Sequence, residues 1–93
     1  MSFFNVTAFN SEEISLPLYV RNRINGDKIH IKNMDSPKKI KDIFINEKIP
    51  ASERDLYPIV VDNNDVVLWI PGIKKSKFDK ANDENYDIIL WYN

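Results

Sequence analysis

The side chains that stand out as a ligand-binding group are three lysines close together in sequence: Lys38, Lys39 and Lys41. They follow Ser36-Pro37, a pair typical of a helix start, because a Ser hydroxyl caps the first turn and Pro lacks an N–H that this turn does not use. At the positive end of the helix dipole each cation costs roughly a few tenths of a kcal/mol. Free N–H groups and added cations at such an end favour anion binding. This locally unfavourable choice is a hint of function.

An apolar stripe predicts the helix that presents these lysines, over residues 37–48. Ile40, Ile43 and Phe44 recur at the i, i+3, i+4 spacing of one buried face, which directs the lysines toward solvent. Ile49-Pro50 ends this helix, and a short second helical turn follows.

Two arginines, Arg21 and Arg23, form a second candidate binding pair. At alternate positions of a predicted strand they share one face and lie roughly 6–7 Å apart, close to the spacing of phosphates along a nucleic-acid strand. The alternative is that Asp27 or Asp42 pairs with one of them and holds the turn at Asn25-Gly26.

The elements that position these side chains predict a mixed α+β domain or a small β-sandwich that carries one main helix. We predict strands over residues 3–9, 16–23, 28–32, 58–62, 66–70 and 86–92. Asn25-Gly26 is a strong hairpin signal between the second and third strands, and the two nearly all-apolar strands should form a central hairpin. Trp69 and Tyr57 are expected in the core, whereas Tyr19 shares the polar face of the arginines.

The distribution of charge is uneven although the formal net charge is only −1. Residues 21–41 hold seven basic side chains against two acidic ones. A second basic group comprises Lys74, Lys75, Lys77 and Lys80. Such segregation builds a basic docking face on a neutral protein, or the charged side chains only solvate the surface.

The composition argues against catalysis by this chain. It has no Cys and one His, His30, which we expect on a polar strand face, so neither a zinc site nor a Cys-His or Ser-His pair can be assembled. Gly26 and Gly72 are too far apart for a phosphate-cradling loop. No apolar run approaches the ~20 residues of a membrane span. We therefore expect one non-catalytic, cytoplasmic domain over residues 1–93, with no cofactor, metal or membrane contact.

Five ordered motifs resemble the C-terminal domain of bacterial tRNA(Ile)-lysidine synthetase. They are Leu16-Pro17-Leu18-Tyr19-Val20-Arg21-Asn22-Arg23, Gly26-Asp27-Lys28-Ile29, Lys38-Lys39-Ile40-Lys41-Asp42-Ile43-Phe44-Ile45, Ile49-Pro50 with Glu53-Arg54-Asp55 and Tyr57-Pro58-Ile59-Val60, and Leu68-Trp69-Ile70-Pro71-Gly72. The resemblance covers about residues 16–76. Asp35-Ser36-Pro37 stands where the family often has a Gly-containing turn, and Tyr57 where it commonly has Trp.

The resemblance implies a β-sandwich of unusual topology with helices, related to a domain of the phenylalanyl-tRNA synthetase β-subunit. It implies that this chain binds and orients tRNA(Ile), near the acceptor stem, for a separate catalytic domain that ligates lysine to the wobble cytidine with ATP and Mg²⁺. The implied contacts are Arg21, Arg23, Lys38, Lys39, Lys41, Arg54, Lys74 and Lys75. Arg54 is also a candidate for an ion pair with Asp55. The rival function is docking on the parent enzyme or homodimerisation through the strand over residues 86–92.

Overall fold

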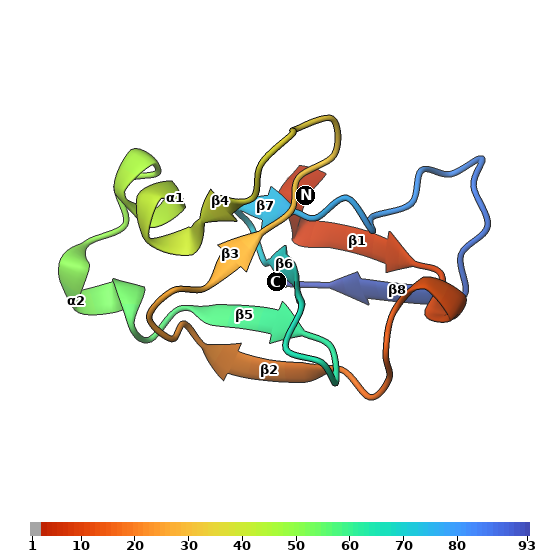
Figure 1. Ribbon diagram of the computed structural model, residues 1–93, viewed down its shortest axis with the longest axis horizontal. Helices are drawn as coiled ribbons and strands as arrows, with labels where there is room; N and C mark the ends of the chain where they lie inside the picture. Colours follow the sequence, from red (N-terminus) through yellow and green to blue (C-terminus); the bar gives the residue numbers. More distant parts are fainter. Residues whose placement is uncertain (1–2) are drawn as a thin grey trace.

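Two β-sheets and two short α-helices make up the part of the chain that the computed structural model describes, residues 3–93 (Figure 1). The elements, with η marking a 3-10 helix, are η1 (Phe3–Asn5), β1 (Val6–Phe9), η2 (Ser11–Glu13), β2 (Tyr19–Asn22), β3 (Lys28–Ile29), β4 (Lys38–Lys39), α1 (Ile40–Asn46), α2 (Ala51–Arg54), β5 (Pro58–Val61), β6 (Val67–Ile70), β7 (Lys74–Lys75) and β8 (Ile88–Trp91). The larger sheet has the order β2-β5-β6-β3-β4 with β7 also on β6, and β1 pairs with β8 in the smaller sheet. The α+β class is confirmed.

The predicted apolar hairpin is confirmed at the centre of the larger sheet. β5 and β6 pair antiparallel, with Val60 opposite Trp69 and a register shift beside Val61. Asp62 is buried in the connecting turn, where its carboxylate accepts the N–H groups of Asn64 and Val66. The Asp62 carboxylate therefore provides hydrogen-bond partners for backbone N–H groups of the turn, and apolar side chains can cover both faces of the hairpin.

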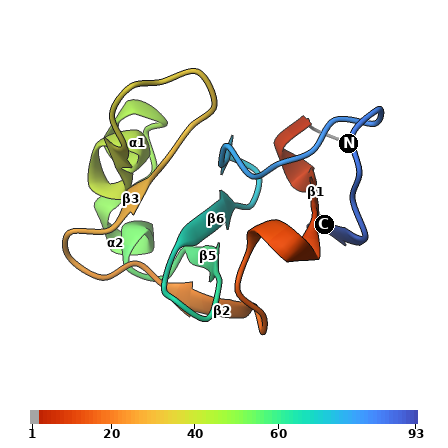
Figure 2. The same cartoon turned by 45° about the vertical axis from the view of Figure 1, so that its right-hand side comes forward.

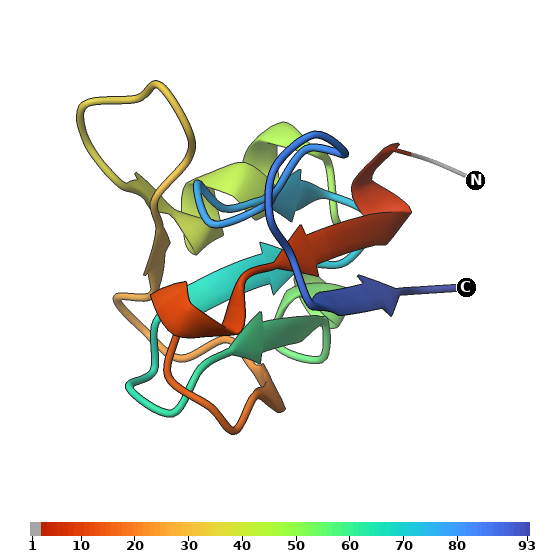
Figure 3. The same cartoon turned by 90° about the vertical axis from the view of Figure 1, so that its right-hand side faces the viewer.

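Apolar side chains cover the two faces of this hairpin from different elements. One core cluster joins α1 to the sheet and contains Ile29, Ile40, Ile43, Phe44, Ile59, Val61, Val67, Ile70 and Ile73. The other joins β1 and β8 to the opposite face and contains Phe9, Val60, Leu68 and Trp69, with Ile88 and Leu90 packed against it. Figure 2 shows the helices and the small sheet on opposite sides of β5 and β6, and Figure 3 shows β1 and β8 in front of them. The domain is thus a layered sandwich with one helical face.

Trp69 and Tyr57, the aromatic residues expected in the core, pack there. Trp69 is buried, and its indole Nε1–H donates to the carbonyl oxygen of Phe4 at 3.0 Å. The half-buried Tyr57 donates its hydroxyl to the carbonyl oxygen of Pro71 at 2.6 Å. These two bonds tie η1 and the end of β6 to the core.

The hairpin expected at Asn25-Gly26 is wrong. The chain does turn there, because Asp27 N–H donates to the Ile24 carbonyl at 3.1 Å and Gly26 has a φ of 91°. However, β2 pairs with β5 at one edge of the sheet, while β3 pairs in parallel with β6 and antiparallel with β4. The apolar hairpin β5-β6 needs partners on both edges, so β2 and β3 take opposite sides of it.

The main helix begins later than residue 37. α1 starts at Ile40, and Lys38 and Lys39 form β4 instead of a first helical turn. Lys39, not Ser36, occupies the cap position, with extended backbone, and its side chain makes no capping hydrogen bond, so the expected cap by Ser36 is also wrong. Lys38 lies opposite Ile29 and Lys39 opposite Lys28, so an extended strand pair takes the place of a first helical turn at these positions. The buried face of Ile40, Ile43 and Phe44 is as predicted, and the second helical turn is α2.

Truncation of Phe44 tests how much the packing of α1 contributes to the free energy of unfolding. Its side chain is fully buried, so Phe44→Ala should lower the free energy of unfolding by about 3–5 kcal/mol in urea titrations at constant m-value. Leu56→Ala is the matched control, because Leu56 is 73% exposed and its truncation should cost less than about 0.5 kcal/mol. Equal losses in the two variants would contradict the assignment of the core to this face.

Candidate nucleic-acid interface

The two arginines of β2 are already engaged by carboxylates. Arg21 forms a two-pronged ion pair with Asp27, with Nη1–Oδ2 and Nη2–Oδ1 distances of 2.8 and 3.1 Å. Arg23 reaches Asp55 beyond the end of α2 at 3.0 Å. The alternative in which Asp27 holds the turn is confirmed, and the side chains of Arg21 and Arg23 remain only 22% and 17% exposed.

The ion pair at the turn is supported by its surroundings. Burial acts to raise the pKa of the Asp27 carboxyl, but hydrogen bonds from Arg21 and from the Ile24 N–H outweigh it and hold that pKa below its usual value. The hydrogen bond to Asp27 raises the pKa of Arg21 in turn. Both groups are therefore charged at neutral pH and lock the segment between β2 and β3 in one conformation.

Arg54 has a structural partner different from the one considered in sequence. Its Nε–H donates to the Ile49 carbonyl oxygen at 2.8 Å, which joins α2 to the segment that follows α1. Within residues 3–93, Asp55 pairs with Arg23 and forms no ion pair with Arg54. The Arg54-Asp55 pair is therefore absent from the described chain.

Four lysines form the lysine strip, which we define as Lys28, Lys38, Lys39 and Lys41. Lys28 of β3 lies directly opposite Lys39 of β4, and both side chains are exposed. Directly opposed residues in an antiparallel pair have Cβ atoms about 4.5–5.5 Å apart, where like charges destabilise the sheet. No carboxylate of residues 3–93 lies within 4.0 Å of any ammonium group of the strip. The strip therefore gathers four ammonium groups that form no ion pair within the described residues.

A shallow hollow adjoins the strip at the junction of β4 and α1. It has a volume of about 500 Å³ and is lined by Pro37, Lys38, Lys39, Asp42, Ile45 and Asn46. The Lys38 side chain is half-buried, and Lys39 follows it on a strand, where successive side chains point to opposite faces. The strip therefore presents cations on more than one side of β4.

The helix start at which an anion site was expected differs in the structure. The N–H of Ile40, the first residue of α1, donates to the Asp27 carbonyl at 3.1 Å, and α1 has only seven residues. Of the three lysines, Lys41 alone lies within the helix. The Ile40 N–H is therefore not available to an anion, and the lysines that would hold one lie on a strand pair and on the first turn of α1.

Lys28 is the member of the strip that sequence reasoning missed as a contact. The expected hairpin at Asn25-Gly26 paired its strand with the strand over residues 16–23, which places Lys28 away from Lys38 and Lys39. The pairing of β3 with β4 brings Lys28 to Lys39, eleven positions later in the chain. A strand assignment for Lys38-Lys39 was the missing signal. His30 is exposed, as expected.

The predicted contacts do not form one continuous face. β2, with Arg21, Arg23 and Tyr19, lies at one edge of the larger sheet, and β4, with Lys38 and Lys39, lies at the other. Tyr19 is exposed there, as expected of a contact residue, but apart from the strip.

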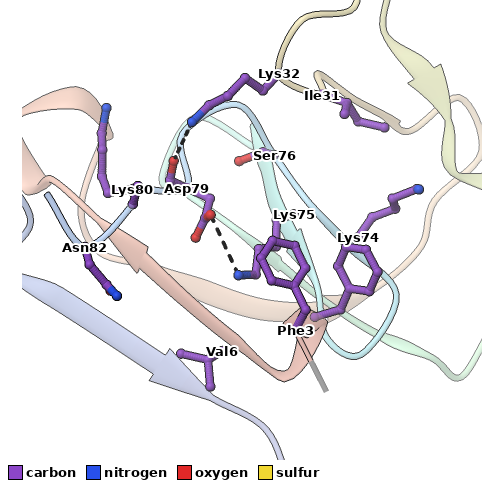
Figure 4. A pocket seen from close by; sticks show the side chains of 12 residues that line it. Phe3, Val6, Ile31, Lys32, Lys74, Lys75, Ser76, Asp79, Lys80 and Asn82 are labelled. Carbon is purple, nitrogen blue, oxygen red and sulfur yellow. Dashed lines mark hydrogen bonds and ion pairs between the residues drawn. The ribbon is translucent and has the colours of Figure 1, made fainter. Parts of the chain in front are cut away.

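The lysines of β7 belong to a separate groove. Lys75 lies 3.7 Å from Asp79 and 3.7 Å from the ring centroid of Phe3, and Lys74 lies 5.7 Å from that of Phe4. These residues line a groove of about 820 Å³ together with Lys32 and Lys80 (Figure 4). β7 pairs with the same edge of β6 as β3, so the groove and the strip follow one edge of the central strand.

Residues 3–93 contain no group of three His, Asp or Glu side chains arranged to hold a metal ion. In the same range, every helix is too short or too polar to cross a bilayer.

Comparison with known proteins gives a consistent set of relatives. The family model described as the TilS substrate C-terminal domain matches residues 18–91. A tRNA(Ile)-lysidine synthase of Bacillus licheniformis is 47% identical over 89 residues, which are 95% of this chain and 19% of that protein. A bifunctional protein TilS/HprT of Listeria monocytogenes serotype 4b is 50% identical over 76 residues, 82% of this chain and 12% of that protein.

Similarity extends to a solved structure. A chain described as a crystal structure of the TILS C-terminal domain superposes with a TM-score of 0.88 at 41% identity, over 98% of this chain and 71% of that one. Against the curated relatives, by contrast, the chain spans about a fifth of their length or less.

The ion pair of Arg21 and Asp27 makes stability depend on pH. Because the folded-state pKa of Asp27 is lowered, its contribution is complete above the unfolded pKa near ~3.9 and is lost as the pH falls through the folded value. Asp27→Asn should therefore cost about 1–3 kcal/mol of unfolding free energy at neutral pH and less at about pH 3, below the unfolded pKa. Urea titrations at the two pH values measure this difference. Asp35→Asn, at an exposed position, is the control; a loss independent of pH in Asp27→Asn would refute the assignment.

Proposed function

This chain belongs to the TilS substrate C-terminal domain family, and we propose that it binds tRNA through the lysine strip and orients it for a catalytic domain elsewhere in the same enzyme. The chain spans 19% of the lysidine synthase from Bacillus licheniformis, which leaves ample length for that domain. The parent enzyme would ligate lysine to the wobble cytidine of tRNA(Ile) in the cytoplasm. ATP, Mg²⁺ and lysine are assigned to its catalytic domain, and no residue of this chain is assigned to them.

The observation that carries this proposal is the opposed pair of Lys28 and Lys39. Lys28 and Lys39 lie directly opposite each other on a short strand pair, and within residues 3–93 neither ammonium group has a carboxylate within 4.0 Å. Like charges in this arrangement destabilise a sheet. A phosphate between or beside them would replace repulsion by attraction. Lysine suits this role because its ammonium is a compact charge with three rotatable donors.

The rest of the strip extends the same surface along a nucleic-acid backbone. Lys41 adds a cation from the first turn of α1, and Lys38 adds one beside the hollow at Asn46. Duplex RNA hides its base edges in a deep major groove, so proteins read its shape, phosphates and 2′-hydroxyls. A rigid set of strand-borne lysines is suited to contacts of this kind, which carry no base sequence.

The arginines have a supporting part in this proposal. Arg21 holds the turn before β3, and Arg23 joins β2 to Asp55 after α2. Arg54 binds the segment that follows α1. Their primary role is to fix the strands and helices that carry the lysine strip. They would contact tRNA only through N–H groups that these bonds leave open.

A specific change in salt dependence tests the strip. The double variant Lys28→Gln/Lys39→Gln should weaken binding of a tRNA transcript and make the slope of log K against log salt shallower by about 2, since each duplex phosphate contact contributes about 0.9. Fluorescence anisotropy across a salt series measures both quantities. The unfolding free energy should stay the same or rise slightly, because the substitution removes a like-charge pair.

Lys48→Gln is the matched control for this experiment. Lys48 is exposed just beyond the other end of α1, so its substitution removes a charge from the same neighbourhood without touching the strip. It should leave the salt slope unchanged. A double variant that unfolds would assign Lys28 and Lys39 a structural role, and one that binds tRNA like the original chain would remove the strip from the interface.

A second candidate function is docking on a protein surface through β8. Its partner within the described chain is β1 alone, and Trp91 is 64% exposed on it. Exposed strand edges pair readily with other chains. Sedimentation at increasing protein concentration distinguishes the two functions: a concentration-dependent dimer abolished by Trp91→Ser, together with an absence of tRNA binding, would favour the protein interface.

A further inference from the structure

The groove beside β7 combines features that the lysine strip lacks. Its lining includes four lysines, the aromatic rings of Phe3 and Phe4, and a single acid, Asp79. The lysines come from three parts of the chain: Lys32 after β3, Lys74 and Lys75 on β7, and Lys80 in the following loop (Figure 4). A site that joins an aromatic platform to cations suits a ligand with both a flat ring and a negative charge.

The cations of the groove differ in how far they are compensated. Lys75 pairs with Asp79 at 3.7 Å, and Lys80 pairs with Glu13 at 2.7 Å. Lys32 is exposed and only 3.9 Å from Glu84, whereas Lys74 has no carboxylate within 4.0 Å in residues 3–93. Lys74 is therefore the group most available to a phosphate; the exposed Lys32 also donates to the Asp79 carbonyl oxygen at 3.4 Å, a weak contact that a phosphate would replace.

Phe3 supplies the platform. It lines the groove but is 70% exposed, an unusual position for a large apolar ring. The Lys75 ammonium lies 3.7 Å from its centroid, and the Phe4 ring packs against it edge-on at 5.0 Å and 76°. The ring is held by two neighbours and still leaves most of its surface open.

The backbone around this platform is anchored to the core. The carbonyl of Phe4 accepts the Trp69 indole N–H at 3.0 Å and the Gly72 N–H at 2.8 Å. Asp79, on the other wall, accepts the Thr7 hydroxyl and the Ala8 N–H at 2.8 and 3.1 Å. These bonds fix η1 relative to β6 and the loop after β7 relative to β1, so the groove is preorganised.

We propose that this groove binds an unpaired RNA nucleotide, with its base stacked on Phe3 and its phosphate at Lys74 and Lys32. The inference rests on the proposed tRNA-binding function and adds a second, single-strand-specific contact to it. A base inside a duplex has no free face, whereas bases at ends, loops and bulges stack on aromatic side chains. Because the groove and the lysine strip follow the same edge of β6, one RNA can reach both where a duplex adjoins a single strand.

Comparison of single-stranded and duplex RNA tests this assignment. Fluorescence anisotropy with a short labelled single strand and a blunt-ended duplex is measured for the whole chain and for Phe3→Ala. We expect Phe3→Ala to weaken single-strand binding roughly fivefold or more, as for loss of one stacked base, and to leave duplex binding unchanged. Leu56→Ala is the control: it removes an apolar side chain about as exposed as Phe3, just after α2, and should change neither affinity.

Two further arms separate stacking from charge. Phe3→Tyr should retain single-strand affinity, and an abasic strand of the same length should bind the original chain as weakly as the natural strand binds Phe3→Ala. Lys74→Gln should make the salt slope for the single strand shallower by about 0.7, the contribution of one single-strand phosphate.

Several outcomes would overturn the proposal. The groove loses its role if the abasic strand binds as tightly as the natural one, or if Phe3→Ala weakens duplex and single strand equally. A chain that binds duplex but no single strand would contradict this inference and leave the proposed function standing, whereas failure to bind either RNA would remove both. If Phe3→Ala lowers the melting temperature, its loss of binding could come from unfolding. The abasic strand with the original chain and the Lys74→Gln variant then test the proposal instead.

Discussion

Asp27 is the residue on which the arrangement of the candidate interface depends. Its carboxylate accepts two hydrogen bonds from Arg21 and one from the Ile24 N–H, and its backbone carbonyl accepts the N–H of Ile40. One residue thus connects β2, the turn, β3 and the start of α1. Because the side chain is only 9% exposed, water screens the ion pair weakly. This junction fixes the register in which β3 meets β4, and with it the position of every cation in the lysine strip.

The charged residues divide into those that build the fold and those that it presents. Guanidinium groups hold the segments together, since Arg21 and Arg23 each meet a carboxylate and Arg54 meets a carbonyl. The strip consists of lysines that have no such partner among residues 3–93. This division follows the chemistry of the side chains: a planar guanidinium makes paired, directional bonds within a structure, whereas an ammonium on a flexible stem adapts to a phosphate. The positive surface is therefore formed by lysines that do not hold segments of the fold together.

Sequence alone was sufficient where the signal was local and insufficient where pairing joined distant segments. The apolar runs around Val60 and Trp69 identified the central hairpin, and the spacing of Ile43 and Phe44 identified the buried face of α1. The turn at Gly26 was also found, but a turn signal does not say which strand lies next to which. β3 pairs with β6, far along the chain, and with β4 across residues 30–37, which contain no Asn-Gly or Asp-Gly turn, so the helix start and the opposed lysines required the structure.

The central claim is that this domain holds RNA by its phosphates through a set of lysines that the fold leaves unpaired. The most direct measurement is the affinity of the unaltered chain for a tRNA transcript across a salt gradient. Neutralisation of about four phosphates by the strip predicts that log K falls with log salt at a slope of about −3 to −4. A slope near zero, or no retention of tRNA at low salt, would contradict the account.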